Sequence, residues 1–398
     1  MGCGSTKPET TVGKVQANRR RLSIGNAPDE SKDIPANEAS EEADRGLVLD
    51  LNQKEITDML NSDNPGNGRK MSIGSSPDQG KTSFANKTIK QGGDHSDSSA
   101  TTAFLGYTCR KGLKPESPNQ DSWFVLKVEK EFSMYAVFDG HGQKGHDVSN
   151  FVKENLPKLI IRDPRFKGNV EEVEKKEMLV ACFKKTQSLI SVMDRTKALS
   201  AQMSGTTATV VVHDHTKQKL LVSHVADSSA VLGKCKKGAG GQLQLEATQL
   251  TRDHKPNLKD ERARIEKNGG RVVFDGYANH RIYAKNARYP GLNMSRCLGD
   301  LMGHQDCGIT AEPEVSVFAI EADHHVLLVC SDGVWEFISP DDAVKIVADF
   351  PPHKAMQAAE RLAKEAWDRW IKEEGGAVVD DITVVCVFLN QQEEQDQA

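Results

Sequence analysis

Four short segments that carry carboxylates lie far apart in this chain, and each lies at one end of an apolar, β-branched run. They are Asn119-Gln120-Asp121, Asp139-Gly140-His141-Gly142, Ser331-Asp332-Gly333 and Asp380-Asp381-Ile382-Thr383. Strand ends are rigid and turns let side chains converge, so a folded domain can gather such oxygen ligands around hard divalent cations. We therefore expect a sheet-rich domain whose strand ends share one acidic site.

The remaining pattern after residue 101 predicts an antiparallel α+β fold. Apolar runs with period two, or continuous and rich in Val, predict strands at 134–138, 207–212, 219–225, 230–232, 326–330 and 382–389. Helical spacing predicts helices at 148–161, 170–193, 260–267, 341–349 and 354–371. Ser339 is a good helix N-cap before Pro340, and Gly269-Gly270 is a good helix stop. Strands and helices do not alternate regularly, which disfavours a doubly wound parallel sheet.

Composition divides the chain of 398 residues into three parts. Residues 1–100 are rich in Ser, Asp, Asn, Gly, Lys and Pro, which predicts a mostly disordered regulatory arm. Within it, 47–60 could form a short strand and helix that dock on the main domain. Residues 101–390 have the composition of an ordinary globular domain, and 391–398 form an acidic polar tail. The net charge of -5 gives no general attraction to nucleic acid.

The sequence also indicates a cytosolic protein with reduced thiols. No apolar run approaches the roughly 20 residues that span a bilayer, and the N-terminus lacks the apolar core of a secretory signal. The eight cysteines include no C-x-x-C pair, and Cys330 and Cys386 lie within strand-like runs as small core residues. Their spacing does not suit a zinc site.

Asp139 follows the 134–138 run and precedes Gly140-His141-Gly142, so its carboxylate should leave the sheet edge where a ligand can approach the backbone closely. A single Asp-Gly pair is also ordinary turn chemistry, and alone it leaves both interpretations open. Asp332 repeats the arrangement after 326–330, and Asp380 leads into 382–389. Three such residues together favour a shared site over three unrelated turns.

Several carboxylates in one cleft repel one another, and bound cations relieve that cost. Oxygen ligands without Cys or clustered His favour Mg²⁺ or Mn²⁺ over Zn²⁺. Two such ions about 4 Å apart can hold a water, lower its pKa and clamp the oxygens of an in-line phosphoryl displacement. His141, beside a ligand, could then protonate a departing alkoxide as a general acid.

With these residues in view, the chain from 103 to 389 resembles the metal-dependent serine/threonine protein phosphatases of type 2C. The segments that carry the resemblance are the four above together with Ser204-Gly205-Thr206-Thr207-Ala208, Leu250-Thr251-Arg252-Asp253-His254-Lys255-Pro256, Ser295-Arg296-Cys297-Leu298-Gly299-Asp300 and Val334-Trp335-Glu336. Their order and spacing make the resemblance specific. It implies a central β-sandwich of two mainly antiparallel sheets flanked by helices on both sides, a four-layer α-β-β-α fold with a two-metal cleft at one end.

The resemblance also implies roles for individual residues. Asp139 would bridge two Mg²⁺ or Mn²⁺ ions, the Gly140 carbonyl would help hold one, and Asp332 and Asp380 would hold the other. Asp121 would act through metal-bound water. Residues 270–300 would form a variable flap beside the cleft that resembles a substrate-selecting element, while 250–256 and 295–300 would brace loops.

The sequence departs from the family pattern at four places. Gln120 replaces a common Glu, a change that catalysis should survive. Gln202 and Glu336 replace acidic positions of members that bind a third metal, which makes a third ion doubtful. Ala226-Asp227-Ser228-Ser229 replaces Gly-Asp-Ser-Arg, a change we interpret as structural. The arginine that grips substrate phosphate in many members has no aligned equivalent, and Lys114 or Arg110 is the candidate replacement.

The N-terminus has the pattern of a lipid anchor. Gly2 matches the N-myristoylation motif, and Cys3 suits palmitoylation. One myristoyl chain binds membrane only marginally, so the second signal would be Cys3 or the basic cluster of Lys14 and Arg19-Arg20-Arg21. The alternative is an unmodified tip. Anchoring would place the protein at the cytoplasmic face of a membrane as well as in the cytoplasm.

Two related segments of the arm predict regulatory phosphorylation. Arg20-Arg21-Leu22-Ser23 and Arg69-Lys70-Met71-Ser72 each place basic residues shortly before a serine, as basic-directed kinases require. The alternative is two solvated basic patches. Phosphorylation of Ser23 would add negative charge beside the basic cluster and weaken its contact with anionic lipid.

The sequence as a whole therefore predicts a membrane-tethered protein phosphatase that hydrolyses phosphoserine and phosphothreonine by attack of a metal-bridging water, without a phosphoenzyme. Its partners would be phosphoproteins, the membrane surface and basic-directed kinases, with no nucleic acid, and we expect a monomer. Two alternatives remain: a catalytically inactive scaffold or binding module with the same fold, and a phosphatase for small phosphoesters.

Overall fold

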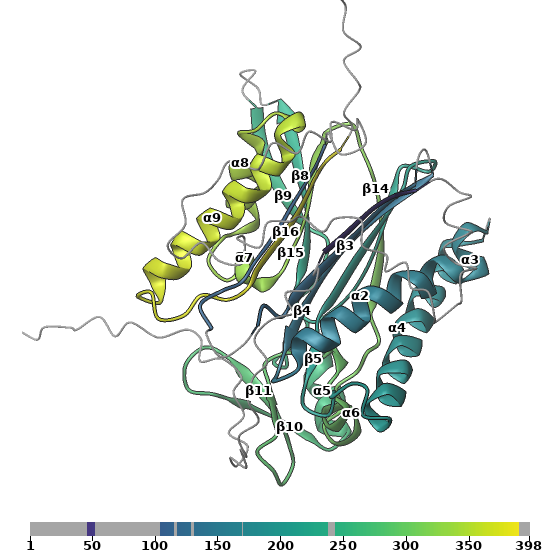
Figure 1. Ribbon diagram of the computed structural model, residues 1–398, viewed down its shortest axis with the longest axis vertical. Coiled ribbons are helices and arrows are strands. Elements are labelled where there is room, and N and C mark those ends of the chain that lie inside the picture. Colours follow the sequence, from purple (N-terminus) through teal and green to yellow (C-terminus); the bar gives the residue numbers. More distant parts are fainter. Residues whose placement is uncertain are drawn as a thin grey trace, which may run out of the picture.

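Two β-sheets pack face to face, and a layer of helices covers the outer face of each (Figure 1). The computed structural model describes residues 46–51, 104–114, 118–128, 131–168, 170–237 and 243–389, with 46–51 described by backbone alone. Residues 1–45 and 52–103 lie outside these ranges. The predictions for Gly2, Cys3, Ser23 and Ser72 therefore fall outside the described residues.

The first sheet has the strand order β1-β3-β4-β6-β7-β14, and every neighbouring pair is antiparallel except β1 with β3. Two short strands, β5 and β13, extend it at the end of β4. The strands are β1 (Gly46–Leu51), β3 (Asp121–Val128), β4 (Phe132–His141), β5 (Gly205–Thr206), β6 (Ala208–Asp214), β7 (Lys219–Val225), β13 (Leu298–Gly299) and β14 (Glu314–Ala319).

The second sheet has the order β2-β16-β15-β8-β9 and is antiparallel throughout. Its strands are β2 (Leu105–Arg110), β8 (Ser229–Lys237), β9 (Leu243–Gln249), β15 (His324–Cys330) and β16 (Ile382–Phe388).

Alternation along the strands explains the layers. In β3, Val125 joins the core between the two sheets, while Phe124 and Leu126 on the other face join the core under the helices. Successive side chains of a strand point to opposite faces, so strands that are apolar on both faces need a covering layer on each side. The near-continuous burial of β3, β4 and β16 matches this arrangement.

Helices supply the two outer layers. Over the first sheet lie α2 (Gly145–Arg162), α3 (Pro164–Lys167) and α4 (Glu172–Arg195). Over the second lie α7 (Asp332–Trp335), α8 (Pro340–Ala348), the 3-10 turn η2 (Pro352–Lys354) and α9 (Ala355–Glu373). As predicted, Ser339 caps α8, because its hydroxyl accepts a hydrogen bond from the Asp342 amide at 3.2 Å.

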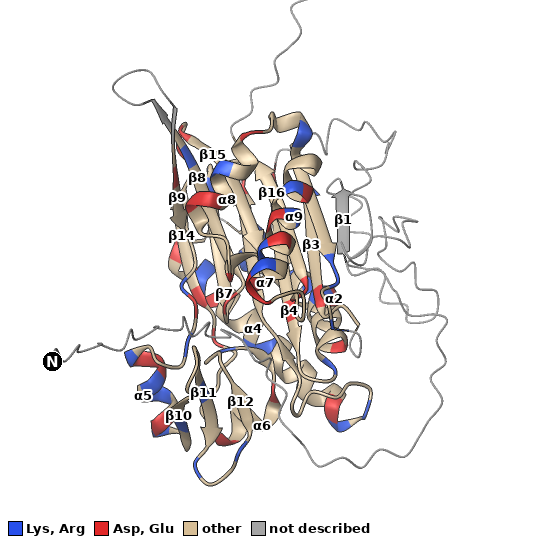
Figure 2. Cartoon of the chain, turned by 90° about the vertical axis from the view of Figure 1, so that its left-hand side faces the viewer, with Lys and Arg blue, Asp and Glu red and all other residues tan. Residues whose placement is uncertain are grey.

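A small third sheet forms the flap. It consists of β10 (Gly270–Phe274), β11 (His280–Ala284) and β12 (Pro290–Leu292), and it lies with α5 (Lys259–Lys267) and α6 (Leu301–Asp306) at one end of the sandwich (Figure 2). Ile265, Ile282 and Leu292 belong to a core cluster of its own. Gly269, with a φ of 91°, follows the end of α5, as the predicted helix stop requires.

The predicted α+β fold, with stacked antiparallel sheets between helices, is therefore confirmed. The predicted strand near residue 47 is confirmed as β1, which adds in parallel to the edge of β3, while the helix predicted after it lies outside the described residues. Cys330 and Cys386 lie fully buried in the core, as expected. Within the described ranges, no helix is both long and apolar enough to cross a membrane.

Candidate active site

The site is built where β3 begins and β4 ends. The two strands are antiparallel, and their register places Asp121 directly opposite Asp139. Directly opposed residues of an antiparallel pair have Cβ atoms about 5 Å apart. Two carboxylates 18 positions apart in the sequence thus become neighbours through the pairing of the strands.

The second sheet contributes two more acidic residues at the matching end. Cys330, at the end of β15, pairs with Val384 near the start of β16, so Asp332 follows one strand where Asp380 precedes the other. Gly333 allows this close approach, because a Cβ there would lie 2.0 Å from the Asp381 carbonyl oxygen. Glycine at this position therefore brings α7 against the segment that carries Asp380.

The electrostatics show that the four carboxylates interact. Burial raises the pKa of Asp139 well above its usual value, and the charges of Asp121, Asp332 and Asp380 raise it further. Burial and the neighbouring charge of Asp381 raise the pKa of Asp121 to about 8. A cluster of this kind stores repulsion that a bound cation would relieve.

Two hydroxyl groups bind one oxygen of Asp121 and leave the other without a partner. Ser331 Oγ and Thr383 Oγ1 both donate to Asp121 Oδ2, each at 2.7 Å. Asp121 Oδ1 is buried and accepts no hydrogen bond from the described residues. A buried carboxylate oxygen without a donor is costly, so this atom fits a cation or a water bound to one.

Asp381 and Gln120 hold the loops around the cluster. The Asp381 carboxylate accepts hydrogen bonds from the Gly112 and Gln120 amides, both at 2.7 Å. The Gln120 side-chain amide donates to the Gly142 carbonyl at 2.6 Å. The glutamine that replaces the usual glutamate thus braces the Asp-Gly-His-Gly turn through an N–H group that a carboxylate lacks.

The two candidate phosphate-binding cations lie in different environments. Lys114 forms an ion pair with Asp380 and is therefore part of the acidic cluster. Arg110 is 5% exposed and pairs with Glu360 of α9, on the outer face of the second sheet. A buried guanidinium held by a carboxylate is a poor phosphate ligand, so the structure favours Lys114 over Arg110.

His141 contacts a residue that the sequence did not single out for chemistry. Its Nε2 lies against the Asp300 carboxylate, which is 1% exposed. Burial alone would lower the pKa of His141, but the charge and hydrogen bond of Asp300 oppose this and the net shift is upward. Nδ1 of His141 is buried and makes no hydrogen bond to the described residues. Asp300 therefore orients the imidazole beside Asp139 and Gly140.

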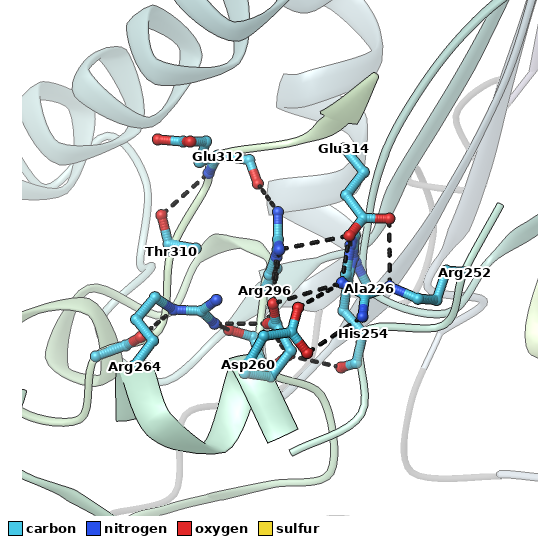
Figure 3. A network of polar contacts seen from close by, with 12 residues as sticks. Ala226, Arg252, His254, Asp260, Arg264, Arg296, Thr310, Glu312 and Glu314 are labelled. Carbon is cyan, nitrogen blue, oxygen red and sulfur yellow. Dashed lines mark hydrogen bonds and ion pairs between the residues drawn. The ribbon is translucent and has the colours of Figure 1, made fainter. Parts of the chain in front are cut away.

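Segments 250–256 and 295–300 were predicted to brace loops, and the contacts of Arg252 and Arg296 agree with that role (Figure 3). Arg252 binds Asp260 through two hydrogen bonds of 3.2 and 2.8 Å and also pairs with Glu314. Arg296 binds Glu261 at 2.6 Å and the Glu312 carbonyl at 3.0 Å. These contacts join α5 to the segment leading into β14 and so fix the flap to the sandwich.

The position linked to a third ion has an internal partner. The Gln202 side-chain amide donates to Asp194, whose other oxygen accepts from the Ala201 amide at 2.9 Å. Both oxygens of this buried carboxylate are therefore satisfied by N–H groups of the chain. Ala226, in the other departure from the family pattern, donates its amide to His254 Nδ1 at 3.0 Å, which fits a structural role.

Comparisons with known proteins agree with this geometry. Residues 112–374 match the family described as Protein phosphatase 2C. "Probable protein phosphatase 2C 48" of Oryza sativa subsp. japonica is 34% identical over 72% of this chain and 84% of its own length. "Probable protein phosphatase 2C 72" of Arabidopsis thaliana is 32% identical over 73% of this chain and 87% of its own length.

A solved structure shows the same fold. The serine-threonine phosphatase 2C from Toxoplasma gondii superimposes with a TM-score of 0.60 at 20% sequence identity, over 71% of this chain and 94% of that chain. The family match and the relatives define the class of protein, a protein serine/threonine phosphatase, which is a phosphoric monoester hydrolase. The chain belongs to the protein phosphatase 2C family, which consists of protein serine/threonine phosphatases and is in general dependent on Mg²⁺ or Mn²⁺.

Three contributors to the site were missed as such from the sequence. Ser331 and Thr383 belong to two of the acidic segments. Only the folded structure, in which β15 pairs with β16, shows that both hydroxyl groups bind Asp121. Asp300 lies 159 positions from His141, and no local pattern joins them. The available signal was chemical: Ser331 and Thr383 carry hydroxyl groups within or beside apolar strand runs, and Asp300 is a carboxylate that directly follows Gly299.

Proposed function

We propose that this phosphatase hydrolyses phosphoserine and phosphothreonine in proteins with two Mg²⁺ or Mn²⁺ ions held by the acidic cluster. The observation that carries the proposal is the mutual repulsion of Asp121 and Asp380, which are buried, and Asp139 and Asp332, which are partly buried, together with the unpartnered Oδ1 of Asp121. The described residues of the cluster offer hard oxygen ligands, which Mg²⁺ and Mn²⁺ prefer.

The ligands in this proposal are those that the sequence predicted. Asp139 would bridge the two ions, the Gly140 carbonyl would join it, and Asp332 and Asp380 would complete the set. Asp121 would act through a bound water. When bound, the ions would offset the carboxylate charge, polarise the phosphate and make water a stronger nucleophile. Lys114 would have to exchange its contact with Asp380 for one with the phosphate or the surrounding water.

The chain's own residues would then orient the substrate and move one proton. The oxygen of water forms a bond to phosphorus, and the ester bond from phosphorus to the serine or threonine oxygen breaks. That leaving oxygen needs a proton, and His141 would supply it and be reprotonated from solvent. Lys114 would contact the phosphate oxygens. The flap at 270–300 would contact residues of the substrate around the phosphorylated side chain.

The test is hydrolysis of a phosphothreonine peptide by the full chain, with and without Mn²⁺, after treatment with a chelator. Wild type should require Mn²⁺, and Asp139→Asn and Asp332→Ala should be folded but inactive at saturating Mn²⁺. Asp349→Asn, a change at an exposed carboxylate at the end of α8, is the matched control. Full activity of either site variant would contradict the ligand assignment, and an inactive wild type would favour the scaffold.

A comparison of substrates distinguishes a protein phosphatase from a phosphatase for small phosphoesters. Phosphothreonine peptides, the corresponding phosphoprotein and a simple sugar phosphate are compared at equal concentration. We expect the highest kcat/KM on the protein or peptide, because the flap would contact residues of the substrate around the phosphorylated side chain. A preference for the sugar phosphate would point to the small-molecule alternative.

We further propose that the enzyme is tethered to a membrane through its N-terminus. The support is the sequence alone: Gly2 in a myristoylation motif, Cys3 beside it and the basic cluster at 19–21. Two signals are needed for stable attachment, so Gly2→Ala should abolish membrane association and Cys3→Ser should weaken it. The measurement is fractionation of both variants with wild type in cells that acylate proteins. Wild type found entirely in the soluble fraction would reject the tether.

A further inference from the structure

The acidic site contains a hydrogen-bonded bridge between its two sheets. Ser331 lies at the junction of β15 and α7, and Thr383 is the second residue of β16. Their hydroxyl groups meet on Oδ2 of Asp121, the first residue of β3, at 2.7 Å each. Ser331 and Thr383 are fully buried, and Asp121 is 1% exposed.

The two hydroxyl-bearing residues are also tied to each other. The Thr383 amide donates to Ser331 Oγ at 3.0 Å, and the Ser331 amide donates to the Thr383 carbonyl at 3.2 Å. The Ser331 hydroxyl thus accepts from one neighbour and donates to Asp121, which leaves it little freedom to rotate. A side chain held in this way offers a rigid donor in a fixed direction.

The bridge lies next to every carboxylate of the cluster. Ser331 directly precedes Asp332, Thr383 follows Asp380 by three positions, and Asp121 is the cross-strand partner of Asp139. A shift of either hydroxyl would therefore move the backbone that carries a predicted ligand. The bridge joins the start of β3 in the first sheet to the second sheet, at the end of the sandwich where the strand ends that carry these carboxylates lie.

The two carboxylate oxygens of Asp121 differ in their hydrogen bonds, and this difference indicates how the bridge acts on the carboxylate. Both hydroxyl groups bind Oδ2, whereas Oδ1 is buried with no hydrogen-bond donor among the described residues. Two donors on one oxygen fix the rotation of the carboxylate about its Cβ–Cγ bond and favour its ionised form. The second oxygen, Oδ1, makes no hydrogen bond to the described residues and remains available for a ligand.

We propose that Ser331 and Thr383 are positioning residues for the metal site: their hydroxyl groups hold Asp121 so that Oδ1 alone faces a divalent cation or its bound water. The inference rests on the proposed function, because it assumes that ions occupy the cluster. According to this inference, the neutral side chains of Ser331 and Thr383 contribute to the affinity of the site for a divalent cation without contacting the cation themselves. Residues that orient metal ligands in this way typically contribute 10–100-fold to affinity.

The experiment measures Mn²⁺ binding directly, by loss of the electron paramagnetic resonance signal of free Mn²⁺ on titration into the chelator-treated full chain. Thr383→Val removes the hydroxyl and keeps the shape of the side chain, and we expect Mn²⁺ affinity to fall about 10–100-fold. Ser331→Ala should act in the same direction. Thr383→Ser restores the hydroxyl and should restore the affinity.

A matched control separates positioning from general loss of a buried hydroxyl. Thr186 is fully buried in α4, and its hydroxyl donates to the Cys182 carbonyl at 2.9 Å, away from the site. Thr186→Val should leave Mn²⁺ affinity unchanged. In hydrolysis assays, raising Mn²⁺ should recover much of the kcat of Thr383→Val with KM for the phosphopeptide close to that of wild type.

The outcomes distinguish the inference from the proposed function. If wild type and Thr383→Val bind Mn²⁺ equally well, the positioning role is refuted and the phosphatase proposal stands. If Thr383→Ser binds as weakly as Thr383→Val, the methyl group matters rather than the hydroxyl, and the inference also fails. If wild type neither binds Mn²⁺ nor hydrolyses the phosphopeptide, the proposed function itself is refuted.

Discussion

Replacing Asp121 by asparagine should stabilise the metal-free protein while weakening its response to metal. Asn has nearly the same shape, and its carbonyl oxygen can accept the hydrogen bonds of Ser331 and Thr383. The change removes an ionisable group from a site where burial and the charges of neighbouring carboxylates, among them Asp139 and Asp381, disfavour its ionised form. An acidic site that exists to hold cations should thus be a source of instability when those cations are removed.

The size of the effect follows from the pKa of Asp121, which burial and the charge of Asp381 raise from 3.8 to about 8. A group whose pKa is higher in the folded state stabilises the fold fully below its unfolded pKa, and this stability is lost as pH rises through the folded value. At pH 7 the cost amounts to roughly 4 kcal/mol, because each pH unit above the unfolded pKa contributes about 1.4 kcal/mol. Asn carries no such cost.

The assay is thermal unfolding of chelator-treated wild type and Asp121→Asn between pH 5 and pH 8, with Asp349→Asn as control. For a domain of this size 1 kcal/mol corresponds to about 2 °C, so the variant should unfold about 8 °C above wild type at pH 7 and much closer to it at pH 5. Saturating Mn²⁺ should raise the Tm of wild type more than that of the variant. A metal-free variant that is no more stable than the control at pH 7 would refute the reasoning.

Three further predictions follow from individual contacts. Lys114→Met should raise KM for a phosphopeptide by about tenfold, the loss expected for roughly one charged contact, while Lys114→Arg should preserve KM; unchanged KM in Lys114→Met would exclude a phosphate contact. Asp300→Asn should lower kcat about 100-fold on a phosphothreonine peptide but much less on p-nitrophenyl phosphate, because the leaving group of the latter needs no proton. Equal losses of kcat on the two substrates would show that Asp300 does not act through His141. Glu261→Gln should lower the free energy of unfolding, measured with denaturant, by about 2–3 kcal/mol. The loss is smaller than for a fully buried ion pair because its partner Arg264 is partly exposed. A loss below about 0.5 kcal/mol would mean that this residue does not hold the flap.

The elements that the sequence predicted well share strong local signals. β15 ends in the apolar run 326–330 and β16 is a mostly β-branched run, and both runs are buried on both faces. A carboxylate next to glycine or another acid lies just after β15 and just before β16. The α8 helix carries its own cap in Ser339 and proline in its first turn. In such segments local preference and tertiary burial agree, so the position of Asp332 and Asp380 at the strand ends could be predicted.

The strands of the flap could not be predicted from the sequence, and the reason is physical. β10 and β11 have only five residues each, and Val273, Phe274 and Tyr277 are exposed near their connecting turn. Short strands with charged residues on one face lack the period-two apolar pattern on which a sequence prediction relies. Their stability comes instead from the Glu261 network and the small core around Ile265, which are both nonlocal.

The partners of site residues were also beyond the sequence. Arg110 was a candidate for phosphate binding because the arginine that grips substrate phosphate in many family members has no aligned equivalent in this sequence. Strand alternation in β2 directs the Arg110 side chain to the outer face of the second sheet, where it forms an ion pair with Glu360 of α9. Asp300 adopts a φ of 41°, a left-handed conformation that directs its carboxylate to His141 and that no sequence pattern announces.

The most direct test of the account is the number of Mn²⁺ ions that the chelator-treated full chain binds at neutral pH, measured by titration calorimetry. We predict two sites in wild type and the loss of tight binding at both in Asp139→Asn, because this carboxylate would contact both ions. A wild type that binds no Mn²⁺, or an Asp139→Asn variant that still binds two ions with unchanged affinity, would contradict the claim that these four carboxylates form a shared metal centre.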